Sequence, residues 1–256
     1  MKKKFKSHMD FVGMTHNFYV DYILSEFLKS NNQNQGNSGV SWFGQWSKLV
    51  FYQPIPPFNP RLLKSLSGND GLFENVDMLD KQSASQYGEL IQFVRENKDI
   101  DLEDIKGINK VFDKNELKIF EELKDITQSF NNSTLKQIDK LEEKAFEASS
   151  KENIALVLAV FSVAKSSAVY WNRDIFNKVW YREMFGDAQD VFASEGGGGS
   201  TTWADVKGAI VGGFWGAVFG GVGGGIGGGI GGSLIASCDQ AAANKEAEEK
   251  EAKDKE

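Results

Sequence analysis

A glycine stands at every fourth position over one stretch of the chain, GAIVGGFWGAVFGGVGGGIGGGIGG, residues 208–232. The positions in this register are Gly208, Gly212, Gly216, Gly220, Gly224, Gly228 and Gly232. In the same four-residue repeat, the second column holds only small residues and the third only large apolar ones. One flat ridge and one bulky ridge favour close helix contact in a membrane, because small residues let two backbones approach. We therefore expect these seven glycines to be helix-packing residues.

This glycine register lies in the longest uncharged run of the chain, between Lys207 and Asp239. The run exceeds the about 20 residues that a membrane-spanning helix needs. Each glycine costs a helix in water about 1 kcal/mol relative to alanine, so the segment alone would not be a stable helix there. In lipid, unsatisfied backbone groups are costlier still, which favours a helix. An irregular coil and a strand stay open, since a four-residue spacing also returns to one face of a strand.

The geometry of the ridge bears on what it contacts. Four residues turn an α-helix by about 400°, so the ridge advances roughly 40° at each step, and one straight partner cannot follow all of it. This predicts a right-handed crossing, several neighbours or a ring of identical helices, and hence a homo-oligomer. A straight helix over the whole run would also exceed the ~30 Å hydrocarbon core, so it must tilt, protrude or break.

The rest of the chain predicts a mainly α protein, a helical bundle body followed by a separate glycine-zipper segment. The predicted units are a body at 1–190 with a polar loop at 30–39 and a proline- and aromatic-rich loop at 41–60, a Gly/Ser linker at 191–202, the glycine-zipper segment at 203–238 and a charged tail at 239–256. A linker is expected because EGGGGST has the composition of a flexible connection.

Apolar residues recur at helical spacing through residues 11–28 and 81–150. Asp113 and Asn115 precede one such helix as candidate caps, and Ser133 is the expected N-cap of another. The residues expected to face inward are Tyr87, Leu90, Ile91, Val94, Leu135, Ile138, Leu141 and Phe146. The apolar run 153–164 is too short to span a membrane, so it predicts the central helix of the bundle.

Composition excludes several functions. A net charge of −7 and a pI near 5.1 argue against a nucleic-acid partner. Cys238 is the single cysteine, and only two histidines accompany it, so we expect no disulfide, no metal site and no cofactor. His16 and Asp21 would lie on different faces of a helix, and no nucleophile motif accompanies them. We expect a structural histidine, no catalytic residue, no small-molecule substrate and no enzyme activity.

The N-terminus does not predict export. The basic start KKKFK lacks the apolar run of 7 to 15 residues that a signal peptide carries next, because polar residues interrupt it. We therefore expect no classical signal peptide and a cytoplasmic helical body. Nearly balanced charges on both sides of the glycine run leave its topology undetermined.

In its G-x-x-x-G spacing, the run 208–232 resembles the glycine zippers of membrane-active bacterial proteins, including the two-peptide class II bacteriocins. GMTHNFYVDYIL, residues 13–24, together with a glycine-rich tail, is also similar to uncharacterised bacterial proteins. The zipper resemblance implies a non-enzymatic, membrane-associated protein whose glycine segment inserts into lipid and self-associates, as a pore-forming or toxin-like element. The alternative is a soluble helical interaction protein whose glycine-rich tail docks on its own body or on a partner.

Overall fold

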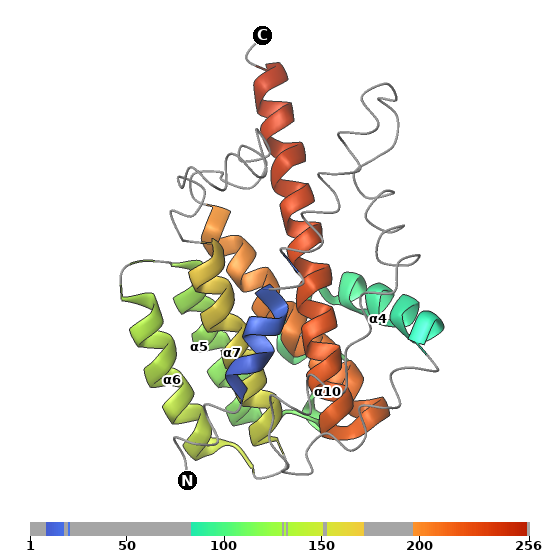
Figure 1. The fold of residues 1–256 in the computed structure, drawn as a ribbon, viewed down its shortest axis with the longest axis vertical. Helices are drawn as coiled ribbons and strands as arrows, with labels where there is room; N and C mark the ends of the chain where they lie inside the picture. Colours follow the sequence, from blue (N-terminus) through green and yellow to red (C-terminus); the bar gives the residue numbers. More distant parts are fainter. Residues whose placement is uncertain are drawn as a thin grey trace.

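The computed structural model describes residues 9–17, 20, 83–129, 131, 133–150, 153–171 and 197–254. All secondary structure in these residues is helical, which confirms the predicted mainly α class. The loops predicted at 30–39 and 41–60, as well as Asp21, lie outside the described residues. Besides a helical stretch at 9–17, the elements are α4 (Ser83–Asn97), η2 (Leu102–Asp104), η3 (Ile108–Lys110), α5 (Lys114–Gln128), α6 (Thr134–Ala148), α7 (Ile154–Trp171) and α10 (Gly197–Asp254) (Figure 1).

Local signals explain where α5 and α6 begin. The Asp113 side chain accepts hydrogen bonds from the backbone N–H groups of Asn115 and Glu116, and the Glu116 side chain accepts one from the Asp113 N–H. This capping box confirms the expected start of α5. Ser133 occupies the N-cap position of α6, but its side chain makes no capping hydrogen bond.

The inward face of α6 is narrower than its apolar pattern predicts. Ile138 and Leu141 are buried, and Phe146 packs partly buried against the core. Leu135 is 40% exposed, so its predicted place in the core is wrong. The buried face of α6 runs through Thr134, Ile138, Leu141 and Ala145, and Leu135 lies at the edge of this face, one position round the helix from Thr134.

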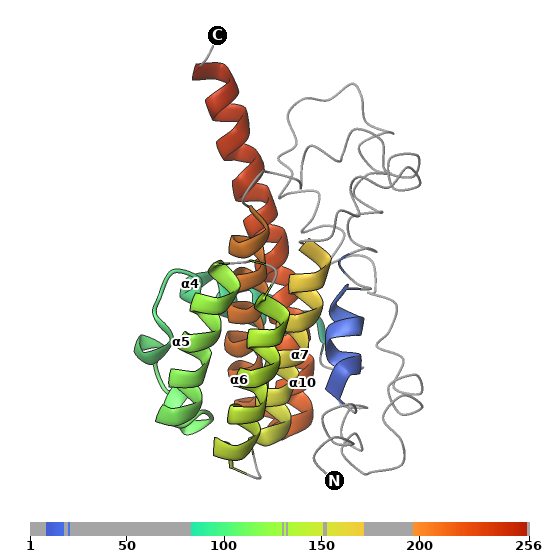
Figure 2. The ribbon, with the colours of Figure 1, turned by 90° about the vertical axis from the view of Figure 1, so that its left-hand side faces the viewer.

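Helix α7 is central, as its apolar sequence predicts. Nearly every side chain from Ala155 to Trp171 is buried, and α7 lies between α6 and α10 (Figures 1 and 2). Lys165 is the charged residue of α7, and its Nζ donates to Glu142 Oε1 of α6 at 3.0 Å. Burial on all sides is what a helix without a polar face requires in a helical bundle.

Helix α10 bends back on itself. Gly220 (φ −137°, ψ 15°) and Gly221 (φ 61°, ψ −153°) interrupt the helical geometry, and the chain reverses there (Figure 1). A positive φ is readily adopted only by glycine, which explains why Gly221 can stand in the turn. We call α10 the glycine hairpin, with a first limb at 197–219 and a second limb at 222–254. The first limb begins inside the segment predicted as a linker, and the second extends past the other described helices toward the C-terminus (Figure 2).

Candidate functional site

The two limbs of the glycine hairpin contact each other through the glycine register. Gly208 lies opposite Gly232, Gly212 opposite Gly228 and Gly216 opposite Gly224. A Cβ at any of these six positions would overlap the backbone carbonyl oxygen of the glycine opposite. Gly220 lies in the turn instead, where a Cβ would meet nothing within 4 Å. The register is therefore symmetric about the turn, and each glycine before it has a partner after it.

This symmetry explains how a ridge that winds around the helix can be covered by a single partner. Each limb presents three successive glycines, over which the ridge turns only about 80°. One antiparallel partner can follow a ridge of that length, and the second half of the same helix supplies it. In this arrangement the ridge is occupied within one chain, without a neighbouring copy.

The second column of small residues faces the body. Ala209, Gly213, Gly225 and Gly229 line a small cavity together with apolar residues of α7. A Cβ at Gly225 would overlap the Leu156 side chain of α7. One small-residue column thus lets the limbs approach each other, and the adjacent column lets the hairpin approach α7.

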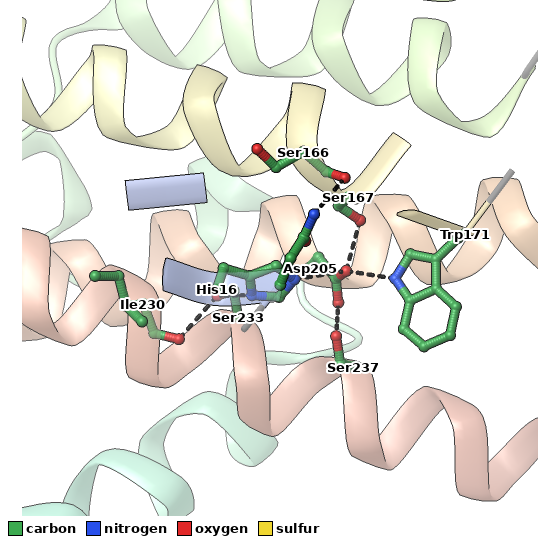
Figure 3. A network of polar contacts seen from close by, with 9 residues as sticks. His16, Ser166, Ser167, Trp171, Asp205, Ile230, Ser233 and Ser237 are labelled. Carbon is green, nitrogen blue, oxygen red and sulfur yellow. Dashed lines mark hydrogen bonds and ion pairs between the residues drawn. The ribbon is translucent and has the colours of Figure 1, made fainter. Parts of the chain in front are cut away.

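A buried carboxylate ties the open end of the hairpin to the body. Asp205, on the first limb, accepts hydrogen bonds at Oδ2 from Ser167 Oγ (2.6 Å) and Trp171 Nε1 (2.8 Å), both on α7. Ser237 Oγ, on the second limb, donates to Oδ1. His16 Nε2 lies 3.2 Å from Oδ2. Asp205 is fully buried, and the low dielectric around it makes its hydrogen bonds costly to remove (Figure 3).

His16 connects the N-terminal segment to both limbs at once. Its Nδ1 lies 2.9 Å from Ser233 Oγ on the second limb, while Nε2 reaches Asp205 on the first (Figure 3). Ser233 Oγ also donates to the Ile230 carbonyl at 2.8 Å. A hydroxyl has one hydrogen but two lone pairs, so Ser233 can donate to the Ile230 carbonyl and still accept a hydrogen bond at its oxygen. His16 therefore contacts one limb through each of its ring nitrogens.

The residues around His16 dock on α7 along one helical face. The Gly13 N–H donates to Ser162 Oγ at 2.9 Å, and Asn17 Nδ2 donates to the Ser166 carbonyl at 3.0 Å. A Cβ at Gly13 would overlap the Ser162 carbonyl oxygen, so this contact requires glycine. Gly13, His16 and Asn17 stand at i, i+3 and i+4, the spacing of one helix face. The GMTHN stretch is therefore a contact face for α7 and the hairpin.

A histidine, an aspartate and serines meet here, but their burial defines what they do. His16, Asp205, Ser167 and Ser233 each have 0% exposed surface. A general base must lie within hydrogen-bond reach of its substrate, whereas these groups are saturated by one another. We call His16, Ser167, Trp171, Asp205, Ser233 and Ser237 the Asp205 clamp. The clamp joins the helical stretch at 9–17, α7 and both limbs of the hairpin, and in it His16 contacts Asp205 and Ser233.

The tip of the hairpin carries two of the three most exposed large apolar side chains among the described residues, the third being Met14. Val218 is 52% exposed and Phe219 67% exposed. The Trp215 and Phe219 rings lie 4.9 Å apart between centroids, so the aromatic surface is continuous. Gly220 and Gly221 beside them are exposed too. We call Trp215, Val218, Phe219 and Val222 the apolar tip.

No family of known proteins matches this chain, and no curated protein or solved structure is similar to it. By length and composition, Ile154–Trp171 and Thr201–Ser237 are apolar enough to cross a membrane, although a buried core helix has the same properties. Within the described residues, no group of three or more His, Cys, Asp or Glu side chains could hold a metal ion.

Proposed function

We propose that this is a non-enzymatic, membrane-associated protein whose glycine hairpin enters a lipid bilayer tip first, as a preformed pair of helices. The observation that carries the proposal is the apolar tip, exposed at the turn of a hairpin that has no charge from Gly208 to Cys238. Exposed apolar surface of this kind, joined to an uncharged segment, favours a lipid partner over water.

The hairpin satisfies the backbone requirement of lipid. Within each limb the backbone is helical, so its N–H and C=O groups are paired before the membrane is reached. Only the turn at Gly220 and Gly221 lacks this pairing, and it carries no charged side chain. A preformed hairpin therefore enters at lower cost than two separate segments would.

The dimensions favour entry from one side. The uncharged part of the first limb, residues 208–219, is about 18 Å long at 1.5 Å per residue. That exceeds one leaflet, about 15 Å, and falls short of the ~30 Å core. Lys207 and Asp239 flank the uncharged limbs at the same end of the hairpin, so both charges stay at the water interface. We therefore propose a re-entrant hairpin, which perturbs the bilayer without spanning it.

Self-association belongs to the same proposal. Ten Ile, Val, Leu and Phe residues between 208 and 237 contribute only about 3 to 6 kcal/mol to insertion, which is marginal. When the hairpin leaves α7, the column that faces α7 becomes free for another hairpin, because small residues favour contact between helices in lipid. Several hairpins together would produce the pore-forming or toxin-like action expected from the glycine-zipper resemblance.

A second candidate function has its own supporting observations. The hairpin docks on α7, and the Asp205 clamp closes that contact with buried hydrogen bonds. Ile210 and Ile230 of the hairpin are fully buried. These contacts are what a soluble interaction protein with a self-docked tail would have. Membrane entry must therefore compete against them, and an experiment has to compare the two states directly.

The test is vesicle flotation of the whole chain, with the tip altered. Val218→Asp with Phe219→Asp places two charges on exposed positions, so folding is spared while lipid entry is opposed. Leu135→Asp, at an exposed position of α6, is the matched control. We expect the wild type and the control to float with vesicles and the tip variant to stay in solution. A wild type that stays in solution would support the second candidate.

Depth is measured on the same protein after Cys238→Ser. An environment-sensitive fluorophore on Val218→Cys should shift to the blue when vesicles are added, and the same label on Leu135→Cys should not. Equal shifts at both positions would indicate adsorption of the whole body, and no shift at either would contradict tip-first entry.

A further inference from the structure

A cavity of about 420 Å³ lies at the open end of the glycine hairpin, opposite the tip. The C-terminal turn of α4, the end of α5 and both limbs form its walls. Its size falls within the range of small-molecule sites, which are concave and combine apolar walls with a few polar groups. The proposed membrane entry makes no use of this cavity.

Three basic side chains line the cavity, but they are not equivalent. Arg95 binds Asp239 with two hydrogen bonds, Nε to Oδ2 at 2.9 Å and Nη2 to Oδ1 at 3.1 Å, so these two charges neutralise each other. The remaining charged groups of the wall are Lys98, Lys207 and Asp99. Their sum is one positive charge, which suits a single negative group.

Lys207 differs from Arg95 in that its ammonium group donates to a backbone carbonyl and not to a carboxylate. It is partly buried, and its Nζ donates to the backbone carbonyl of Lys98. Burial lowers the pKa of Lys207, although Asp99 acts in the opposite direction. An ammonium held away from water gains more from an anion than an exposed lysine does, because screening is weaker there.

The rest of the lining is largely apolar and contains an aromatic ring. Trp203, Val94 and Val211 line it, together with Ala204 and Ala236. Lys124 Nζ lies 5.8 Å from the centroid of the Trp203 ring, so one side of the indole is already covered by a cation. The wall offers contact area for a short hydrocarbon chain next to the Lys207 ammonium.

We propose that this cavity binds a small amphipathic monoanion, a carboxylate with a short hydrocarbon tail. The carboxylate would pair with Lys207 and the tail would lie along Trp203 and Val211. Such a ligand bridges α4 and both limbs, so it stabilises the docked hairpin by mass action. This inference does not depend on membrane entry, since the cavity exists in the docked state.

Isothermal titration calorimetry with octanoate, below the concentration at which it forms micelles, tests the proposal. We expect saturable binding to the whole protein at one site, and affinity lower by about tenfold or more for Lys207→Gln. Lys118→Gln, an exposed lysine on α5, is the matched control and should bind like the wild type. Octanol has the same tail without the charge and should bind at least about tenfold more weakly.

Each other result overturns the proposal. Absence of octanoate binding to the wild type removes the site. Equal affinity for octanol and octanoate removes the role of the charge, and equal affinity of the Lys207→Gln variant places the anion elsewhere. Ala204→Phe provides a second check, since a ring in the cavity should abolish binding while the circular dichroism spectrum and melting temperature show that the protein is folded.

Discussion

The two ends of the glycine hairpin differ in what holds them. At the open end, Asp205 is fully buried and receives hydrogen bonds from α7 and the second limb. At the tip, Phe219 is 67% exposed and Gly220 has nothing within 4 Å of a would-be Cβ. One end is fixed by buried polar contacts, and the other is left to the solvent.

This difference separates stability from function along a single helix. Polar groups that are buried and paired fix one arrangement, because leaving any of them unpaired is costly. An exposed apolar tip contributes little to folding, since its area stays in water. The open end therefore determines whether the hairpin is docked, and the tip determines what it meets first when it moves.

The largest expected effect comes from filling the limb–limb contact. In Gly212→Leu the new side chain would overlap the carbonyl oxygen of Gly228, and backbone cannot move aside as a side chain can. We expect a loss of at least about 3 kcal/mol of unfolding free energy, measured by urea denaturation. Gly220→Leu is the control, because open space surrounds it. Equal losses in the two variants would contradict the antiparallel pairing.

The next largest loss of stability is expected at the open end of the hairpin. Asp205→Asn keeps the shape but replaces one acceptor oxygen with a donor, while Ser167, Trp171 and His16 all point at the carboxylate. We expect a loss of about 1 to 3 kcal/mol in thermal unfolding. Asp239→Asn is the control, since its ion pair with Arg95 keeps contact with solvent and should contribute below about 1 kcal/mol. If Asp205→Asn were no less stable than Asp239→Asn, the Asp205 clamp would not be what holds the open end of the hairpin on the body.

Much of the helical framework can be predicted from local patterns. Asp113 caps α5 because a short acidic side chain with Glu116 three residues later forms a capping box, and this spacing is visible in the sequence. The apolar run of α7 indicates a buried helix because it has no polar face. The prediction for Leu135 is wrong because helical spacing identifies a face but not how wide a part of it the neighbouring helices cover, and Thr134 beside it is buried instead.

The turn of the hairpin and the Asp205 clamp could not be predicted from local patterns, for two different reasons. A turn is usually marked by a glycine, but here glycine stands at so many positions that none of them marks Gly221 as the one with positive φ. The clamp joins residues far apart in the chain, His16 and Asp205, and no periodicity relates them. The face spacing of Gly13, His16 and Asn17 is a signal that could have indicated a contact surface.

A third effect separates the two glycines of the turn. Gly221→Ala places a Cβ on a residue with φ 61° and ψ −153°, a conformation that is essentially confined to glycine, so it should cost about 1 to 3 kcal/mol. Gly220→Ala has a negative φ and open space, so it should change stability by less than about 0.5 kcal/mol. Chemical denaturation of both variants measures the difference. If Gly220→Ala were the more destabilised of the two, the reversal would not lie where the backbone angles place it.

The smallest effect lies at the edge of the fixed end and depends on pH. Because burial lowers the pKa of Lys207, the folded protein holds this proton less tightly than the unfolded chain, and the charged form disfavours folding. That penalty is present at neutral pH and fades as pH rises toward the ordinary lysine value of 10.5, where both states become neutral. Lys207→Met removes the penalty. The unfolding free energy of the variant minus that of the wild type should therefore be larger at pH 7 than at pH 10.5.

The change should stay below about 1 kcal/mol, because solvent screens a partly buried group. Met also removes the hydrogen bond to the Lys98 carbonyl. That loss lowers the stability of the variant by an amount that does not follow the titration of Lys207. Melting curves of both proteins across this pH range isolate the titrating part. A stability difference that is flat with pH would mean that Lys207 is as well solvated in the folded protein as in the unfolded chain, and that the open end fixes the hairpin without burying a charge that opposes it.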